Sequence, residues 1–292
     1  MTWQAVARKD FQDAVRSKWL WGMAAIFLGL FVGSAYFIGS NVPNDGSLTT
    51  DAFVRTLGQF VIALVIPLVA TVASYSSVVG ERESGTIKLL LSLPHSRKDA
   101  IVGKTVGRSA VVAVSILSGL VLALVVLAAY GVGVKILNYL AFVVLTVLLG
   151  VVFVSIAVAV SAATSTNRRA MLGTVGLYVL FTMLWTQVRR ILSLFNDQLS
   201  LGLDTMTLVK YGLFIKYFNP VRAYETLLAR LYTGSVLDAR LYGAGRMEKQ
   251  IITQRLGDVP FYLSDPVVVA QFLLWLLVPV AVGYWVFKDE DL

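Results

Sequence analysis

Six long runs without a charged side chain constrain the fold of this 292-residue chain more than any other feature. They cover residues 19–44, 56–80, 109–134, 136–167, 170–188 and 266–287. Each run can supply the ~20 apolar residues that a helix needs to cross a bilayer. Only 14% of the residues are charged and the mean hydropathy is +0.76, whereas soluble domains carry about a quarter charged residues. The sequence therefore predicts an all-α, polytopic membrane protein.

We expect one transmembrane helix in each run and treat residues 1–292 as a single membrane domain. The fourth run exceeds one span, and its small, polar end SAATSTN leads us to end that helix near Val160. The expected helices cover residues 19–39, 57–79, 109–133, 139–160, 170–188 and 267–287. An interfacial helix (1–18) is expected before them. A loop over 80–108 joins the second helix to the third, and an outer segment over 189–266 joins the fifth to the sixth.

Positive charges predict the orientation, because Lys and Arg in short loops stay preferentially on the cytoplasmic side. With the N-terminus inside, the four inner segments hold 13 Lys and Arg residues and the two short outer segments hold two. The other ten lie in 189–255, which is too long for the rule to apply. The count predicts cytoplasmic N- and C-termini in the cell membrane. It also accounts for the net charge of +8 without a nucleic-acid partner.

The first 18 residues form a basic leader with apolar residues at every fourth position. These are Trp3, Ala7, Phe11, Val15 and Trp19. The spacing predicts an amphipathic helix that lies along the inner membrane surface. The alternative is a solvated tail that only fixes the topology. The leader and the run behind it are both too long for a cleaved secretory signal.

The predicted spans carry little chemistry. They contain no Asp, Glu, Lys, Arg or His, the chain has no cysteine, and its only histidine is His95 in a predicted loop. Ion-driven transporters usually keep ionisable groups within the membrane, so the driving energy is expected to come from elsewhere. A membrane enzyme would need catalytic or metal-binding groups that these spans lack.

Two glycine patterns have ordinary explanations. The fragment GKT at 103–105 matches the end of a phosphate-binding loop, but the leading glycine of that motif would fall on Lys98, and the fragment enters an apolar helix instead of following a strand. Gly29 and Gly33 form a GxxxG pair, for which we expect ordinary packing within the helix bundle.

The loop over 80–108 is unusually dense for a connection between two spans. Its sequence, ERESGTIKLLLSLPHSRKDAIVGK over 81–104, places a short leucine-rich cluster between charged groups. Pro94 ends any helix in that cluster, and Ser96 can cap the next helix with Asp99 three positions on. We expect a short helix parallel to the membrane that contacts a soluble partner. A loop that merely joins two spans is the alternative.

This loop resembles the cytoplasmic loop of ABC-2 type permeases, nearest to the branch that includes the permease for nitrous-oxide-reductase maturation. The matching residues are Glu81, Arg82, Glu83, Gly85, Thr86, Leu89, Leu90, Pro94, Ser96, Arg97, Gly103 and Lys104. The resemblance implies that the first ten of these form a coupling helix, seated on a separate ATPase subunit that would hold ATP and Mg. It also implies a second permease copy, identical or related. No cofactor and no catalytic residue is expected in this chain, and the substrate is not indicated.

The outer segment contains a second recognisable helix start, in NPVRAYETLLARLY. Asn219 is placed to cap it, with Pro220 at its first position. An apolar stripe follows: Val221, Tyr224, Leu227, Leu228 and Leu231. A metal role such as copper binding is poorly supported, because this segment has no His or Cys and its methionines, Met206 and Met247, are far apart. A membrane scaffold or sensor subunit without transport activity remains the functional alternative.

Overall fold

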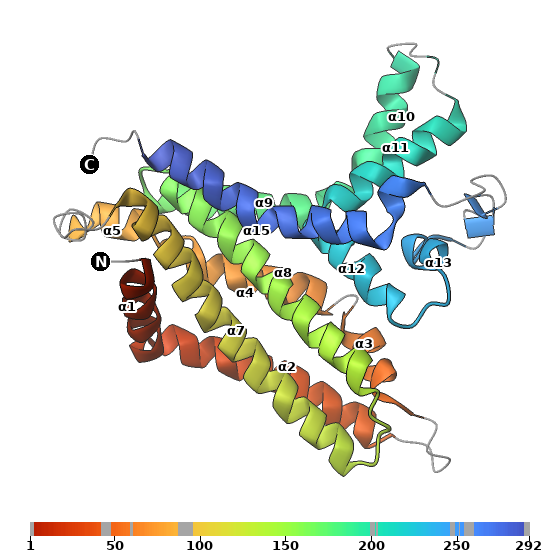
Figure 1. Cartoon of the computed structure of the whole chain (residues 1–292), viewed down its shortest axis with the longest axis horizontal. Coiled ribbons are helices and arrows are strands. Elements are labelled where there is room, and N and C mark those ends of the chain that lie inside the picture. The colour runs from red at the N-terminus through yellow and green to blue at the C-terminus, as the bar shows by residue number, and fades with distance from the viewer. Residues whose placement is uncertain are drawn as a thin grey trace. The chain divides into compact units, whose positions relative to one another are not determined.

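The computed structural model describes residues 3–41, 48–58, 61–86, 96–198, 202, 204–245, 249–250, 252–253 and 260–288 (Figure 1). Its helices confirm the all-α fold, and the only strand-like pairing among these residues is one bridge between Thr49 and Gly133. Chain contacts divide the protein into two compact units. Unit 1 comprises Met1–Tyr178 and Trp275–Leu292, and unit 2 comprises Val179–Leu274.

Unit 1 contains long apolar helices together with shorter, more polar ones. In chain order they are α1 (Trp3–Arg16), α2 (Lys18–Gly39), α3 (Thr50–Gly58), α4 (Val61–Ser74), α5 (Val79–Glu83), α7 (Arg97–Ala129), α8 (Ile136–Ala162), most of α9 (Asn167–Thr182) and the last part of α15 (Asp265–Phe287). The helices α2, α7 and α8 run side by side, and α4 packs on α8 (Figure 1). Glycine permits the closest of these contacts. A Cβ added at Gly119 would lie 2.6 Å from the Phe31 ring, so α2 and α7 meet there almost backbone to backbone.

Five helical stretches in the described part of the chain are long and apolar enough to cross a membrane. They are Trp21–Gly39, Ile62–Glu83, Arg97–Ala129, Ile136–Ala162 and Asp265–Phe287. These match five of the six expected spans. The helix of the third stretch begins 12 residues before the start expected at 109. The expected start is set by the apolar run, whereas the helix also includes the polar residues that precede this run. With 33 residues α7 is about 50 Å long and exceeds a hydrocarbon core of about 30 Å.

The expected fifth span, 170–188, is not one continuous helix. The helix α9 ends at Thr182, a 3₁₀ turn η1 covers Leu184–Gln187, and α10 (Val188–Gln198) follows. A tertiary contact accompanies this break. The carbonyl of Phe181, which in a continuing helix would accept from the amide four residues on, accepts from Nδ2 of Asn219 at 2.7 Å.

Unit 2 is a group of shorter helices. They are α10, α11 (Thr205–Phe218), α12 (Pro220–Arg230), α13 (Val236–Arg240), the 3₁₀ turn η2 (Phe261–Leu263) and the start of α15. The predicted start of α12 is confirmed, since Asn219 Oδ1 accepts from the amides of Val221 and Arg222 and Pro220 occupies the first turn. Its stripe forms the core of the unit: Val221, Tyr224, Leu227 and Leu228 are buried, and Leu231 is half-buried.

The glycine pair of α2 does not have the expected packing. Gly29 and Gly33 are exposed, and a Cβ added at either would meet no described atom within 4 Å. The pair therefore faces away from the helices of its own unit.

Candidate functional site: the segment between α5 and α7

The short helix α5 is fixed at its start by the end of α8. The Oγ of Ser161 accepts hydrogen bonds from the amides of Val78 and Val79, both at 3.1 Å. All three residues are buried. The first amides of a helix have no partner within the helix, and Val78 offers no side chain to cap them. Ser161 supplies that cap from more than 80 positions away in the sequence.

The three charged residues of α5 all have partners within the chain. Glu81 pairs with the buried ammonium of Lys104 at 2.7 Å. Arg82 donates to the carbonyl of Thr164 at 3.0 Å. Glu83 accepts from the backbone amide of Asn167 at 2.8 Å and from its side-chain amide. The resemblance to ABC-2 type permeases implies that these residues belong to a coupling helix seated on an ATPase subunit, which their contacts within the chain do not test. Here they link α5 to α7, to the α8–α9 loop and to the first turn of α9.

Beyond α5 the chain becomes exposed. Gly85 adopts a left-handed φ of 74°, which glycine accepts without steric cost, and the hydroxyls of Ser84 and Thr86 share a hydrogen bond of 2.9 Å. Ser84, Gly85 and Thr86 are all exposed. Leu89, Leu90 and Pro94 lie outside the described residues, as does the rest of 87–95. The short leucine-rich helix therefore stays a prediction.

The chain re-enters the bundle at Ser96. The predicted cap is confirmed and is reciprocal: Ser96 Oγ accepts from the Asp99 amide at 3.1 Å, and Asp99 Oδ2 accepts from the Ser96 amide at 3.1 Å. The next residue, Arg97, donates from Nη1 to the carbonyls of Phe287 at 2.8 Å and Lys288 at 3.0 Å. Its guanidinium lies 5.7 Å from the centre of the Phe287 ring, and that of Arg82 lies 5.9 Å from it. Both ends of the segment thus contact the end of α15.

The first turns of α7 pack against α1. A Cβ at Gly103 would lie 2.5 Å from the Cβ of Val6, and one at Gly107 would lie 2.9 Å from the Ala7 carbonyl. The fragment GKT lies within α7, and its glycine forms a helix contact. The buried face of α1 is Val6, Ala7, Asp10 and Ala14, whereas Trp3 and Val15 of the predicted stripe are exposed. The helix is packed on α7 and is not a solvated tail.

A buried ion pair reinforces this contact. Asp10 Oδ2 lies 3.1 Å from Arg108 Nε, with the Asp10 side chain only 7% exposed. Burial raises the pKa of Asp10, and this effect outweighs the opposing attraction of Arg108 and Lys104. Arg108 also donates from Nη1 to the carbonyl of Ala73 in α4 at 3.2 Å. The pair joins α1 to both α7 and α4.

Five residues of this site could not be predicted from the sequence: Asp10, Arg108, Ser161, Asn167 and Phe287. Only the contact of α1 had a visible signal, the GxxxG spacing of Gly103 and Gly107, which permits close helix approach. Arg108 lies within α7 itself, whereas Ser161, Asn167 and Phe287 have ordinary residue types and contact α5 or α7 from positions remote in the sequence. No local pattern identifies such partners.

The structure thus defines a class: a multi-pass membrane protein in which helix ends gather around one short charged segment. The chain belongs to the ABC-2 family of transporter proteins. The model of that family, described as ABC-2 family transporter protein, matches residues 4–292. It is 32% identical over 193 residues to the probable ABC transporter permease protein NosY of Pseudomonas aeruginosa, covering 62% of this chain and 66% of that protein. It is 29% identical over 187 residues to the protein of the same name from Stutzerimonas stutzeri, covering 63% and 67%.

Proposed function

We propose that this chain is the membrane-spanning permease subunit of an ATP-driven transporter, and that the segment from Glu81 to Arg97 contacts a separate ATPase subunit. The family and the name of both relatives support a permease role. The ATPase would bind ATP and Mg and would supply the energy source that the apolar spans of this chain lack. A second copy of this chain, or a related permease, would complete the pathway.

The observation that carries this proposal is the set of contacts at the two ends of the segment. Glu81, Arg82 and Glu83 join it to α7, to the α8–α9 loop and to α9, and Arg97 joins it to α15. A partner that moved the segment would therefore act on α7, α9, α15 and the loop after α8 together. Such rigid displacement of packed elements is an established way to switch a protein between two states.

The orientation belongs to the same proposal. An ATPase that works in the cytoplasm requires the α5–α7 segment on that side, and with it both termini. The positive-charge count predicts this arrangement in the cell membrane.

The test uses the chain co-expressed with a candidate ATPase subunit and reconstituted with it in vesicles. Leu90→Asp places a carboxylate in the predicted apolar contact, and should abolish co-purification and lower the ATP hydrolysis that the pair supports. Leu137→Asp, in the first turn of α8 and so beyond the other end of α7, is the matched control; Leu137 is 78% exposed, and this variant should retain both. If Leu90→Asp also retains both, the segment is only a connector, and a scaffold or sensor subunit becomes the better assignment.

A further inference from the structure

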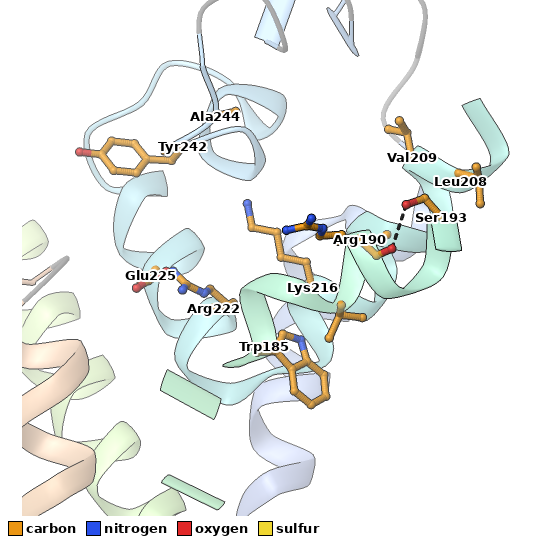
Figure 2. Close-up of a pocket in the computed structure, with 13 residues that line it drawn as sticks. Trp185, Arg190, Ser193, Leu208, Val209, Lys216, Arg222, Glu225, Tyr242 and Ala244 are labelled. Atoms are coloured by element: carbon orange, nitrogen blue, oxygen red, sulfur yellow. Dashed lines mark hydrogen bonds and ion pairs between the residues drawn. The ribbon is translucent and has the colours of Figure 1, made fainter. Parts of the chain in front are cut away.

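Unit 2 contains a cavity of about 720 Å³ that the proposed function does not use (Figure 2). Its wall is formed by η1, α10, α11, α12 and the turn that follows α13. Pockets that bind small molecules typically measure about 300–1,000 Å³. The size is therefore that of a ligand site.

The charges that line the cavity are unequal. Arg190, Lys216 and Arg222 contribute three cations, and Glu225 is the one carboxylate among the described lining residues. Glu225 is already paired, with its Oε2 at 2.7 Å from Nη1 of Arg222. Figure 2 shows the side chains of Arg190 and Lys216 directed into the same part of the cavity. A cleft lined by one sign of charge concentrates ligands of the opposite sign.

The rest of the wall is largely apolar and includes an aromatic ring. Trp185 lines the cavity, and its indole N–H donates to the carbonyl of Ile215 at 3.0 Å, which fixes the ring. Val188 and Leu208 lie on the same wall. The site therefore offers cations that can bind an anionic group, and apolar surface that can contact an apolar body attached to that group.

We propose that this cavity binds an oxyanion, a phosphate or a carboxylate, carried on an apolar body. Arg190 and Lys216 would contact the anion, and Trp185 would contact the apolar part. Two sources have this chemistry: the headgroup of an anionic lipid and a free soluble anion. The proposal does not depend on the permease function, because binding to the purified chain tests it without an ATPase.

Trp185 provides a local probe. In a variant of the full chain whose other five tryptophans are phenylalanine, fluorescence reports on this cavity alone. The protein, in nanodiscs of phosphatidylcholine, is titrated with dihexanoyl phosphatidylglycerol, with dihexanoyl phosphatidylcholine and with inorganic phosphate. A saturable response to phosphate identifies a free anion, and a response to phosphatidylglycerol alone identifies an anionic lipid. Either response supports the proposed anion contact, and tighter binding of phosphatidylglycerol than of phosphate supports the apolar contact, whereas no response, or an equal response to both lipids, overturns the proposal.

Charge variants then locate the site. Lys216→Gln and Arg190→Gln should each weaken binding about tenfold, because each removes a charge-assisted contact. Lys210→Gln is the matched control on α11, since Lys210 is exposed and does not line the cavity. Glu225→Gln should tighten binding by releasing Arg222, a gain that misfolding cannot imitate. Equal effects of Lys216→Gln and Lys210→Gln, or weaker binding by Glu225→Gln, would contradict the assignment.

Discussion

The guanidinium of Arg240, which is completely buried, donates from Nη2 to Oδ1 of Asp265 at 2.5 Å. The same group donates from Nε to the Leu263 carbonyl at 2.8 Å and from Nη1 to Thr226 Oγ1 at 3.0 Å. Its donors therefore join α12 and α13 to η2 and to the first residue of α15. A buried charge is tolerated when it is paired and its hydrogen bonds are satisfied, as they are here.

Arg240→Ala should destabilise the protein by about 3 kcal/mol, at the low end for a broken buried ion pair because Asp265 remains 37% exposed. Lys249→Ala breaks the exposed pair with Asp238 and should cost less than about 1 kcal/mol. Thermal unfolding in detergent measures both. Equal losses would show that the Arg240 contacts do not stabilise unit 2.

The pKa of Asp10 predicts a pH dependence of stability. Because burial raises it above 3.8, the folded protein binds more protons than the unfolded chain between 3.8 and the raised value. Stability from this group is present below 3.8 and falls as the pH rises through that window. Relative to Asp10→Asn, the native protein should therefore gain stability between pH 7 and pH 4. A relative loss on acidification would mean that Arg108 dominates and that the pKa is lowered.

Gly103→Ala should separate α1 from α7, because the new Cβ would lie 2.8 Å from the Trp3 carbonyl, and backbone cannot yield as a side-chain end can. Overpacking of this kind costs about 1–3 kcal/mol. Gly29→Ala is the control, also within a helix but with no described atom within 4 Å, and should be neutral or slightly stabilising. The melting temperatures of the two variants test this contact, and similar values would show that α1 is not closely packed on α7.

Glu83→Lys should uncouple the ATPase without releasing it. The change removes two hydrogen bonds to Asn167 and places a cation near the positive end of α9, at a cost of about 1–3 kcal/mol. Asp13→Lys, an equal charge reversal at an exposed position of α1, is the control. In the reconstituted pair, Glu83→Lys should keep co-purification but lower transport-coupled ATP hydrolysis. Lost co-purification with a normal melting temperature would instead place Glu83 in the ATPase contact.

The orientation can be tested by labelling, because the chain has no cysteine of its own. Ser165→Cys in the α8–α9 loop should be protected from an impermeant thiol reagent added outside intact cells. Gly234→Cys, in an exposed turn of unit 2 that accepts a Cβ freely, should react. Reaction of Ser165→Cys with the reagent from outside would contradict the proposed topology.

The sequence by itself determined the features that depend on near neighbours. A bilayer requires about 20 consecutive apolar residues, so five membrane-length helices could be predicted from the runs alone. The caps at Ser96 and Asn219 were predictable for the same reason, since a cap and the amides it binds lie within three residues. The leucine-rich helix around Leu90 stays a prediction of this kind.

Only the tertiary structure decided which partner each polar group takes. Glu81, Arg82 and Glu83 have charges that suit either another subunit or this chain, and their observed partners lie more than 20 positions away for Glu81 and more than 80 for the other two. The end of α9 similarly depends on Asn219, which donates to Phe181 from 38 positions on. An apolar run specifies a helix through spacing, but a buried ion or carbonyl is satisfied by whichever group the fold brings within about 3 Å. Packing therefore determines the partner of each buried polar group, and the local sequence does not specify that partner.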